Sequence, residues 1–436
     1  MSLRISSRFL SGALLALTAS LVLAAQAVAG NFNPKTFRLG NGLDVVVIED
    51  HRAPVVHHMV WYRVGSADEP PGKSGIAHFL EHLMFKGTET IPPGEFSKII
   101  ARNGGRDNAF TTYDYTGYYQ TVAADKLDLV MRLEADRMAH LAIPPAEVER
   151  EREVIIEERR SRTDNNPGAL LSEQMMATLF LAHPYRIPVI GWLHEMRDLT
   201  HADAVAFYKE HYSPSNAILV VAGDVTPEQV RELAEKHYGP IPAGTAKTRM
   251  RLREPPHIAP RRVTLEDGRV KQPSYSRYYV APSYSTAEGR DAYALTVLAE
   301  ILGAERTGRL YRELVVGEGP AVSVSAWYQG TALDYGTFGL GGRPRNGTDL
   351  PALEAAIDRV VAEMLEKGIT EDELARAKRG LLAGAIFARD SISTAARIFG
   401  SALTTGSSVE DVEAWPERIE AVTADEVLAS ARKVFD

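Results

Sequence analysis

The first half of the chain alternates between segments with the period of strands and segments with the period of helices. Apolar runs and Thr- or Tyr-rich runs predict strands over 43–48, 55–64, 108–113, 118–122 and 217–222. Amphipathic stretches predict helices over 95–102, 126–138, 146–162, 199–212 and 227–237. This alternation is typical of an α/β (α+β) fold.

The second half repeats the pattern in a weakened form. The segment that begins at Ile143 matches the one that begins at Ile369, and the segment at Leu199 matches the one at Val422. We therefore expect two homologous domains. Generic similarity between helices is the alternative explanation.

Proline-rich sequence separates the two halves. Residues 239–262 are predicted to be a linker between a domain at 30–238 and a domain at 263–436. About 400 residues follow the first thirty, enough for two domains of roughly 200 residues each. The first domain continues past its last matched helix into the strand 217–222. The sequence ends at Asp436, after the matching helix, so we expect the second domain to lack a last strand.

The N-terminus has the pattern of a cleavable signal peptide spanning 1–29. Two arginines precede an apolar run at 9–23, and small residues at 25–27 or 27–29 offer a cleavage site. An uncleaved membrane anchor is the alternative, but the apolar run is short for a bilayer span. No other segment is apolar enough to cross a membrane. We therefore expect a periplasmic protein without a stable membrane anchor.

The amino-acid composition of the chain argues against several classes of structure and function. The chain has no cysteine, which excludes disulfides and a lipoprotein anchor. The net charge is -8, the arginines are mixed with glutamates, and no basic patch carries interleaved aromatic residues. Nucleic acid is therefore not an expected partner.

The candidate chemistry begins in a mostly apolar segment at 75–87, which reads GIAHFLEHLMFKG. On a helix, His78 and His82 lie one turn apart, and Glu81 lies beside His82. Two imidazoles at this spacing can bind one divalent metal ion, and a neighbouring carboxylate can deprotonate a water. This His-x-x-Glu-His order is the inverzincin signature. Histidines at an accidental spacing are the alternative.

The helix predicted at 146–162 carries two acidic residues on its apolar stripe. Val148, Glu151, Ile155 and Glu158 follow one another at helical spacing, whereas the remaining charges are typical of a solvated face with ion pairs. A carboxylate on an apolar stripe needs an inward partner. A metal ion already held by two histidines would be one.

The second half lacks these residues. Ala377 and Gly384 take the places of Glu151 and Glu158, and the predicted helix at 293–302 contains no histidine. We therefore expect one metal site per chain.

These motifs resemble the pitrilysin, insulin-degrading-enzyme and mitochondrial-processing-peptidase family of inverzincin zinc peptidases. The most specific matches are the segments 75–87, 151–158 (EREVIIEE) and 212–217 (YSPSNA). The resemblance implies two related α/β domains, each with a mixed β-sheet flanked by helices. It also implies a zinc ion on His78, His82 and Glu158, with Glu81 as the general base and Glu151 assisting.

The resemblance also places a substrate-binding edge strand at Asn108, Ala109, Phe110 and Thr111. An exposed edge there could bind an extended peptide by β-augmentation, with weak sequence preference. An ordinary hairpin strand is the alternative.

These expectations combine into a zinc-dependent endopeptidase that hydrolyses unfolded polypeptides or peptides. The alternative is a non-catalytic peptide-binding or assembly protein of the same fold. A purely structural zinc site is disfavoured, because three protein ligands leave one position open.

One departure from the family concerns substrate binding from the second domain. Family members carry there an Arg and, seven residues later, a Tyr, where this chain has Val315 and Val322. Neither valine can donate a side-chain hydrogen bond. We therefore expect a heterodimer with a homologous subunit that lacks the zinc motif and supplies the Arg and Tyr. Substitution by Arg309, Tyr311 or Arg312, or a homodimer, are the alternatives.

Overall fold

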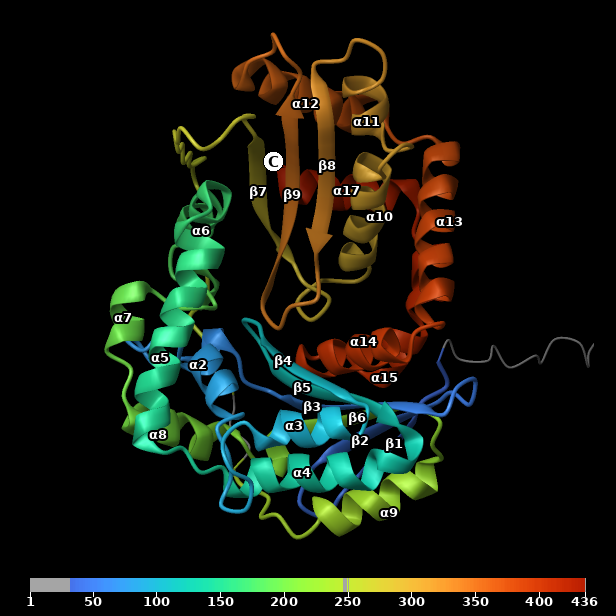
Figure 1. Ribbon diagram of the computed structural model, residues 1–436. Coiled ribbons are helices and arrows are strands. Elements are labelled where there is room, and N and C mark those ends of the chain that lie inside the picture. Colours follow the sequence, from blue (N-terminus) through green and yellow to red (C-terminus); the bar gives the residue numbers. More distant parts are fainter. Residues whose placement is uncertain (1–31, 246–248, 250, 436) are drawn as a thin grey trace, which may run out of the picture.

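A computed structural model describes residues 32–245, 249 and 251–435. The predicted signal peptide at 1–29 lies outside these residues. Two halves, each with its own sheet, are joined by an irregular segment (Figure 1). In the part of the chain that is described, no helix is both long enough and apolar enough to cross a bilayer.

The first sheet is mixed and has the strand order β1-β2-β6-β3-β5-β4. Its strands are β1 (Lys35–Arg38), β2 (Asp44–Glu49), β3 (Val55–Tyr62), β4 (Arg106–Thr111), β5 (Thr116–Ala123) and β6 (Ala217–Gly223). β2 and β6 pair in parallel, and all other neighbours are antiparallel. β4 forms one edge of the sheet, so only one side of its backbone is paired.

Helices of the first half cover one face of this sheet. They are α2 (Ile76–Leu83), α3 (Glu95–Arg102), α4 (Leu127–His140), α8 (His201–His211) and α9 (Pro227–His237). Phe79 and Leu80 of α2 and Val130 of α4 pack into one apolar core with Val56 and Val60 of β3. α5 (Pro145–Arg159), α6 (Pro167–Leu179) and α7 (Leu193–Arg197) extend this layer beyond the sheet (Figure 1).

The second sheet repeats part of this topology with β7 (Tyr275–Pro282), β8 (Ala321–Gln329) and β9 (Tyr335–Pro344). Its order β7-β9-β8 corresponds to β3-β5-β4 of the first sheet. The two-domain α/β architecture is thus confirmed. The expected mixed sheet is found in the first half, whereas the described second sheet is antiparallel throughout. Among the described residues of the second half, the parallel β2–β6 pair has no counterpart, and residues 255–274 before β7 run as mostly exposed coil outside any described strand.

Helices of the second half pack on one face of β7–β9. They are α10 (Asp291–Gly303), α11 (Arg309–Leu314), α12 (Leu350–Lys367), α13 (Glu371–Ala388), α16 (Trp415–Glu420) and α17 (Ala424–Phe435). After α13 the chain crosses to the other half through α14 (Ile392–Thr404) and α15 (Val409–Glu413).

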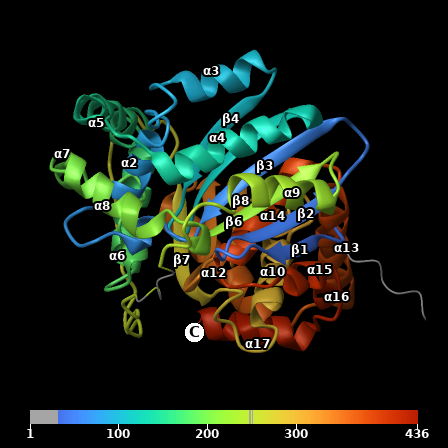
Figure 2. The same cartoon turned by 90° about the horizontal axis from the view of Figure 1, so that it is seen from below.

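α14 covers the face of the first sheet opposite α4 and α9 (Figures 1 and 2). Phe399 and the alanines 395 and 396 pack on Met59, Trp61 and Val220. A Cβ at Gly400 would overlap the indole of Trp61, so only glycine allows this approach. The central strands β2, β3 and β6 of the first sheet are therefore covered on both faces, which explains why β6 is apolar at every position.

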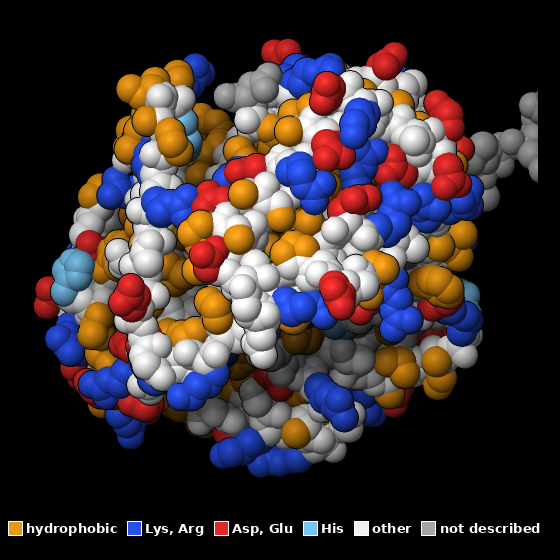
Figure 3. Space-filling model, turned by 90° about the horizontal axis from the view of Figure 1, so that it is seen from above, with side chains coloured by type: hydrophobic (Ala, Val, Ile, Leu, Met, Phe, Trp, Pro, Cys, Tyr) orange, Lys and Arg blue, Asp and Glu red, His pale blue; other side chains and the backbone are white. Residues whose placement is uncertain are grey.

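The surface seen from above carries Lys and Arg side chains interspersed with Asp and Glu (Figure 3). Neither positively nor negatively charged side chains dominate that face. The irregular segment between His237 and Tyr275 carries no described helix or strand, and it contains the predicted linker.

Candidate metal centre

The two helices that carry the candidate residues bring three possible metal ligands together. Nε2 of His82 and Nε2 of His78 lie 3.2 and 3.6 Å from Oε2 of Glu158. The three ligand atoms all lie within 4.8 Å of one another, and no other such group occurs among the residues described. α2 and α5 thus converge as their apolar stripes predict.

Glu158 Oε2 is buried, and the two imidazole nitrogens are the groups that face it. Its second oxygen, Oε1, pairs with Arg162 at 2.6 Å. A buried carboxylate oxygen that faces two imidazole nitrogens is costly unless a cation joins them. Two nitrogens and one carboxylate oxygen are a donor set that fits zinc and leaves a fourth position open.

A carboxylate behind His82 orients this imidazole. Nδ1 of His82 lies 2.9 Å from Oε1 of Glu151, which can only accept, so Nδ1 carries the proton and Nε2 is directed at Glu158. Lys86, one turn beyond His82, pairs with Oε2 of Glu151 at 2.5 Å. Glu151 therefore contacts a candidate ligand, His82.

Burial and the neighbouring groups shift the pKa values of the two histidines in opposite directions. Burial and the neighbouring His82 lower the pKa of His78 to about 4. Burial also opposes protonation of His82, but hydrogen bonds to Glu151 and Glu158 outweigh it and raise the pKa of His82 to about 9. The hydrogen bond from His82 lowers the pKa of Glu158.

Glu81 lies on α2 beside the ligands, with only 8% of its surface exposed. Burial raises the pKa of its carboxyl group, as suits a base that works near neutral pH. The hydroxyl of Thr111, the last residue of β4, donates to Oε2 of Glu81 at 2.6 Å. This bond links the candidate base to the end of the candidate substrate strand.

The edge strand β4 contains Asn108, Ala109 and Phe110, which pair on one side with Tyr119, Tyr118 and Gly117 of β5. The ring of Phe110 covers Gly117, where a Cβ would overlap it, and packs edge-on against Trp61. The N–H of Ala109 donates to the side chain of Asn108 at 2.9 Å. Because this N–H faces outward, we take it as the backbone donor that an added strand could use at the free edge of β4.

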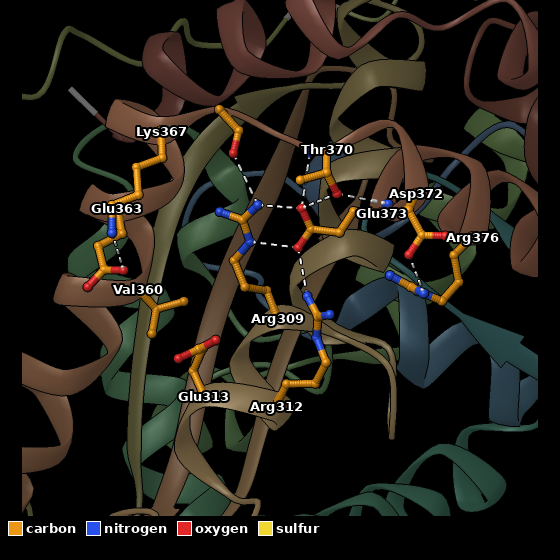
Figure 4. A pocket seen from close by; sticks show the side chains of 11 residues that line it. Arg309, Arg312, Glu313, Val360, Glu363, Lys367, Thr370, Asp372, Glu373 and Arg376 are labelled. Atoms are coloured by element: carbon orange, nitrogen blue, oxygen red, sulfur yellow. Dashed lines mark hydrogen bonds and ion pairs between the residues drawn. The ribbon is translucent and has the colours of Figure 1, made fainter.

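In the second half, Arg309 and Arg312 both point to the carboxylate of Glu373 in one polar pocket (Figure 4). Their shortest distances to it are 2.5 and 2.7 Å. Val322, at the position of the expected Tyr, is 44% exposed, and Val315 is half-buried.

Reasoning from the sequence did not anticipate the contacts of Thr111, Lys86 and Arg162. Lys86 and Arg162 follow His82 and Glu158 by four residues, so helical spacing could have suggested that each lies near a site residue. No local signal links Thr111 to Glu81, because that contact depends on how β4 docks beside α2.

Comparisons with known proteins agree with this geometry. The model described as "Insulinase (Peptidase family M16)" matches residues 44–191, and the model described as "Peptidase M16 inactive domain" matches residues 198–381. The zinc protease PqqE of Helicobacter pylori is 33% identical over 391 residues, which cover 88% of this chain and 86% of that protein.

Solved structures show the same fold. A protease from Helicobacter pylori superimposes with a TM-score of 0.85 at 30% identity, covering 92% of this chain and 97% of that one. The first half of the periplasmic protease PqqL from Escherichia coli gives a TM-score of 0.74 at 20% identity, covering 92% and 89%, and at this identity it shows the fold alone. The predicted family is confirmed: this chain belongs to the insulinase (M16) family of peptidases.

Proposed function

We propose that the chain is a zinc-dependent endopeptidase that hydrolyses unfolded polypeptides or peptides and forms the catalytic subunit of a heterodimer. The observation that carries the proposal is the convergence of the imidazole nitrogens of His78 and His82 on the buried Oε2 of Glu158, beside the buried Glu81. The relatives named zinc proteases support it.

His78, His82 and Glu158 would hold one zinc ion. When bound, zinc supplies Lewis-acid chemistry to the reacting water and to the scissile carbonyl group. Glu81 takes the proton of that water and passes it to the leaving amide nitrogen. Because Thr111 occupies Oε2 of Glu81, the free Oε1 is the atom that carries the proton. Glu151 and Lys86 keep His82 in the tautomer that ligation requires.

The substrate binds as an added strand on the free edge of β4. Backbone hydrogen bonds give such a strand affinity with little dependence on its side chains, which suits unfolded polypeptides. The Glu81–Thr111 bond supports this arrangement, since it sets the base at the end of the same strand.

The second half of the chain supports a paired enzyme. Val315 and Val322 offer no hydrogen-bond donor, and Arg309 and Arg312 are held by Glu373, which argues against their substitution for the missing Arg. A donor lost from such a site lowers the rate on the order of a hundredfold or more. A homologous subunit without the zinc motif supplies the Arg and Tyr in this proposal.

The N-terminal sequence pattern supports export to the periplasm through a cleaved signal peptide. N-terminal sequencing of the protein isolated from cells tests this assignment. A mature chain that begins near residue 30 is expected.

Two substitutions test the catalytic site. Glu81→Gln is expected to keep one zinc ion per chain and to lose peptide hydrolysis, because only the base is removed. Glu158→Gln is expected to lower the zinc content itself. Full hydrolysis by Glu81→Gln would contradict the mechanism. A purified protein that binds peptides without cleaving them, with or without a partner, would favour the non-catalytic alternative.

Assay of the isolated chain, followed by the same assay with the partner subunit, tests the pairing. We expect low turnover alone and a rise of on the order of a hundredfold in the pair. Full turnover by the isolated chain, unchanged by the partner, would contradict it.

A further inference from the structure

A cluster of charges around one buried arginine joins the linker to both halves of the molecule. The guanidinium of Arg251, whose side chain is 4% exposed, lies among Asp68, Asp114 and Asp334. Its Nη2 lies 2.9 Å from Asp68, and its Nη1 lies 2.9 Å from Asp334 and also pairs with Asp114. One linker side chain thus contacts three aspartates from three separate parts of the chain.

The first aspartate belongs to the approach to the metal helix. Asp68 precedes Glu69, whose carboxylate accepts the N–H groups of Gly75 and Ala77 at 2.9 Å each. These N–H groups belong to the first turn of α2, which has no cap from its own N-cap side chain. Arg249 adds a second linker contact to Asp68, at 2.6 Å. A shift of Asp68 would therefore move Glu69 and disturb its hydrogen bonds to the start of α2.

The second aspartate belongs to the turn between β4 and β5. The carboxylate of Asp114 accepts the hydroxyl of Tyr185 at 2.7 Å and the N–H of Leu333, from the second half, at 3.0 Å. Two backbone hydrogen bonds also hold this turn: the N–H groups of Ser66 and Ala67 donate to the carbonyl groups of residues 112 and 113 at 2.9 Å. The turn after β4 is thereby fixed relative to the approach to α2.

The third aspartate belongs to the turn between β8 and β9. Asp334 also lies 3.2 Å from Nε2 of His183. Because Arg251 is shared by all three carboxylates, a movement of the second half relative to β4 would separate a buried arginine from its partners.

We propose that Arg251 is a positioning residue that sets the free edge of β4 relative to α2 and fixes the second half against both. The inference rests on the proposed function, since it assigns the linker a part in substrate binding. The linker is then a rigid element of the site.

The experiment separates substrate binding from domain orientation. Binding of a fluorescent unfolded peptide is measured by anisotropy in the zinc-loaded full chain carrying Glu81→Gln, which prevents cleavage. Spin labels on the exposed residues Ala101 of α3 and Ala383 of α13 report the distance between the halves by double electron–electron resonance. Zinc content is measured in every variant.

Arg251→Gln is expected to weaken peptide binding about tenfold and to broaden the distance distribution, with zinc content unchanged, and Arg251→Lys is expected to restore part of both. Arg253→Gln, at an exposed arginine two residues further along the linker, is the matched control and is expected to change neither. Unchanged binding and distances in Arg251→Gln would overturn the proposal.

Two milder substitutions keep the test decisive if Arg251→Gln does not fold. Asp114→Asn retains an acceptor oxygen for the N–H of Leu333 and is expected to weaken peptide binding with little change in distance. Asp334→Asn is expected to broaden the distance distribution. Loss of zinc together with peptide binding in both variants would indicate general destabilisation and contradict a positioning role. A wild-type chain that shows no peptidase activity even together with its partner subunit would contradict the proposed function, whereas the distance measurement would still decide the role of Arg251.

Discussion

Glu151 contacts the candidate ligand His82, and a substitution at Glu151 can test whether that contact matters for zinc binding. Glu151→Gln keeps an acceptor for Nδ1 of His82 but removes the charge that favours its proton, and it leaves Lys86 without its partner. We expect zinc affinity to fall about 10- to 100-fold, as measured by competition with a chromophoric chelator.

Glu153→Gln is the control for this substitution, because Glu153 lies on the exposed side of the same helix. It is expected to leave zinc affinity unchanged. Equal affinities of the two variants and the wild type would remove Glu151 from the site.

The release of a proton from His82 when zinc binds is a second testable property at the scale of single residues. Burial opposes protonation of His82, but hydrogen bonds to Glu151 and Glu158 raise its pKa to about 9 in the metal-free protein. Below that pH, zinc must displace a proton from His82, so affinity rises as pH rises and levels off once His82 is neutral. We expect an increase of about tenfold per pH unit between about pH 6.5 and pH 8.5. A pH-independent affinity would show that His82 is not a ligand.

At the scale of elements, the free edge of β4 makes a prediction of its own. Ala109→Pro removes the N–H that faces outward and leaves the Thr111–Glu81 bond in place. We expect KM for an unfolded peptide to rise about tenfold, with kcat within about twofold, when the paired enzyme is assayed. Asn108→Ala, which frees the same N–H from its side-chain acceptor, is expected to leave KM equal or lower. An unchanged KM in Ala109→Pro would mean that β4 is only a hairpin strand.

Elements with strong local signals could be predicted to the residue. The predicted helix at 227–237 is found as α9, because Thr226 and Gln229 form a capping box and Pro227 occupies the first turn. The predicted helix at 146–162 ends instead at Arg159 and continues as a π-helical turn over Arg160–Asp164. No residue in the sequence marks that change, since Arg and Ser continue a helical composition.

The candidate metal ligands could be predicted from the sequence because each motif lies on one helix, where the spacing of residues determines which side of the helix they share. His78, Glu81 and His82 share one turn of α2, and Glu151 and Glu158 share one stripe of α5. The contacts of Thr111 and Arg251 are different, because they join segments far apart in the chain. Periodicity carries no information on such pairs.

At the scale of the whole molecule, α14 ties the two halves together, because it follows α13 of the second half in sequence but packs on the first sheet. Gly400→Ala places a methyl group where the indole of Trp61 lies, so α14 must move away from the first sheet. We expect a loss of about 1–3 kcal/mol in the free energy of unfolding, measured by urea denaturation. Gly384→Ala on the exposed side of α13 has open space around it and is expected to be neutral or stabilising by up to about 1 kcal/mol. Equal stability of the two variants would mean that the α14 contact is loose.

The position of α14 late in the chain also determines the order in which the molecule can be completed. A polypeptide that leaves the ribosome or a translocation channel N-terminus first presents β2, β3 and β6 well before α14 exists. Until then, the face that carries Met59, Trp61 and Val220 is an apolar surface without a cover. During biogenesis the first half therefore depends on α14 to cover its sheet. Until α14 is made, the exposed apolar face is a surface that chaperones bind, and we expect a nascent chain stalled before residue 392 to remain bound to them.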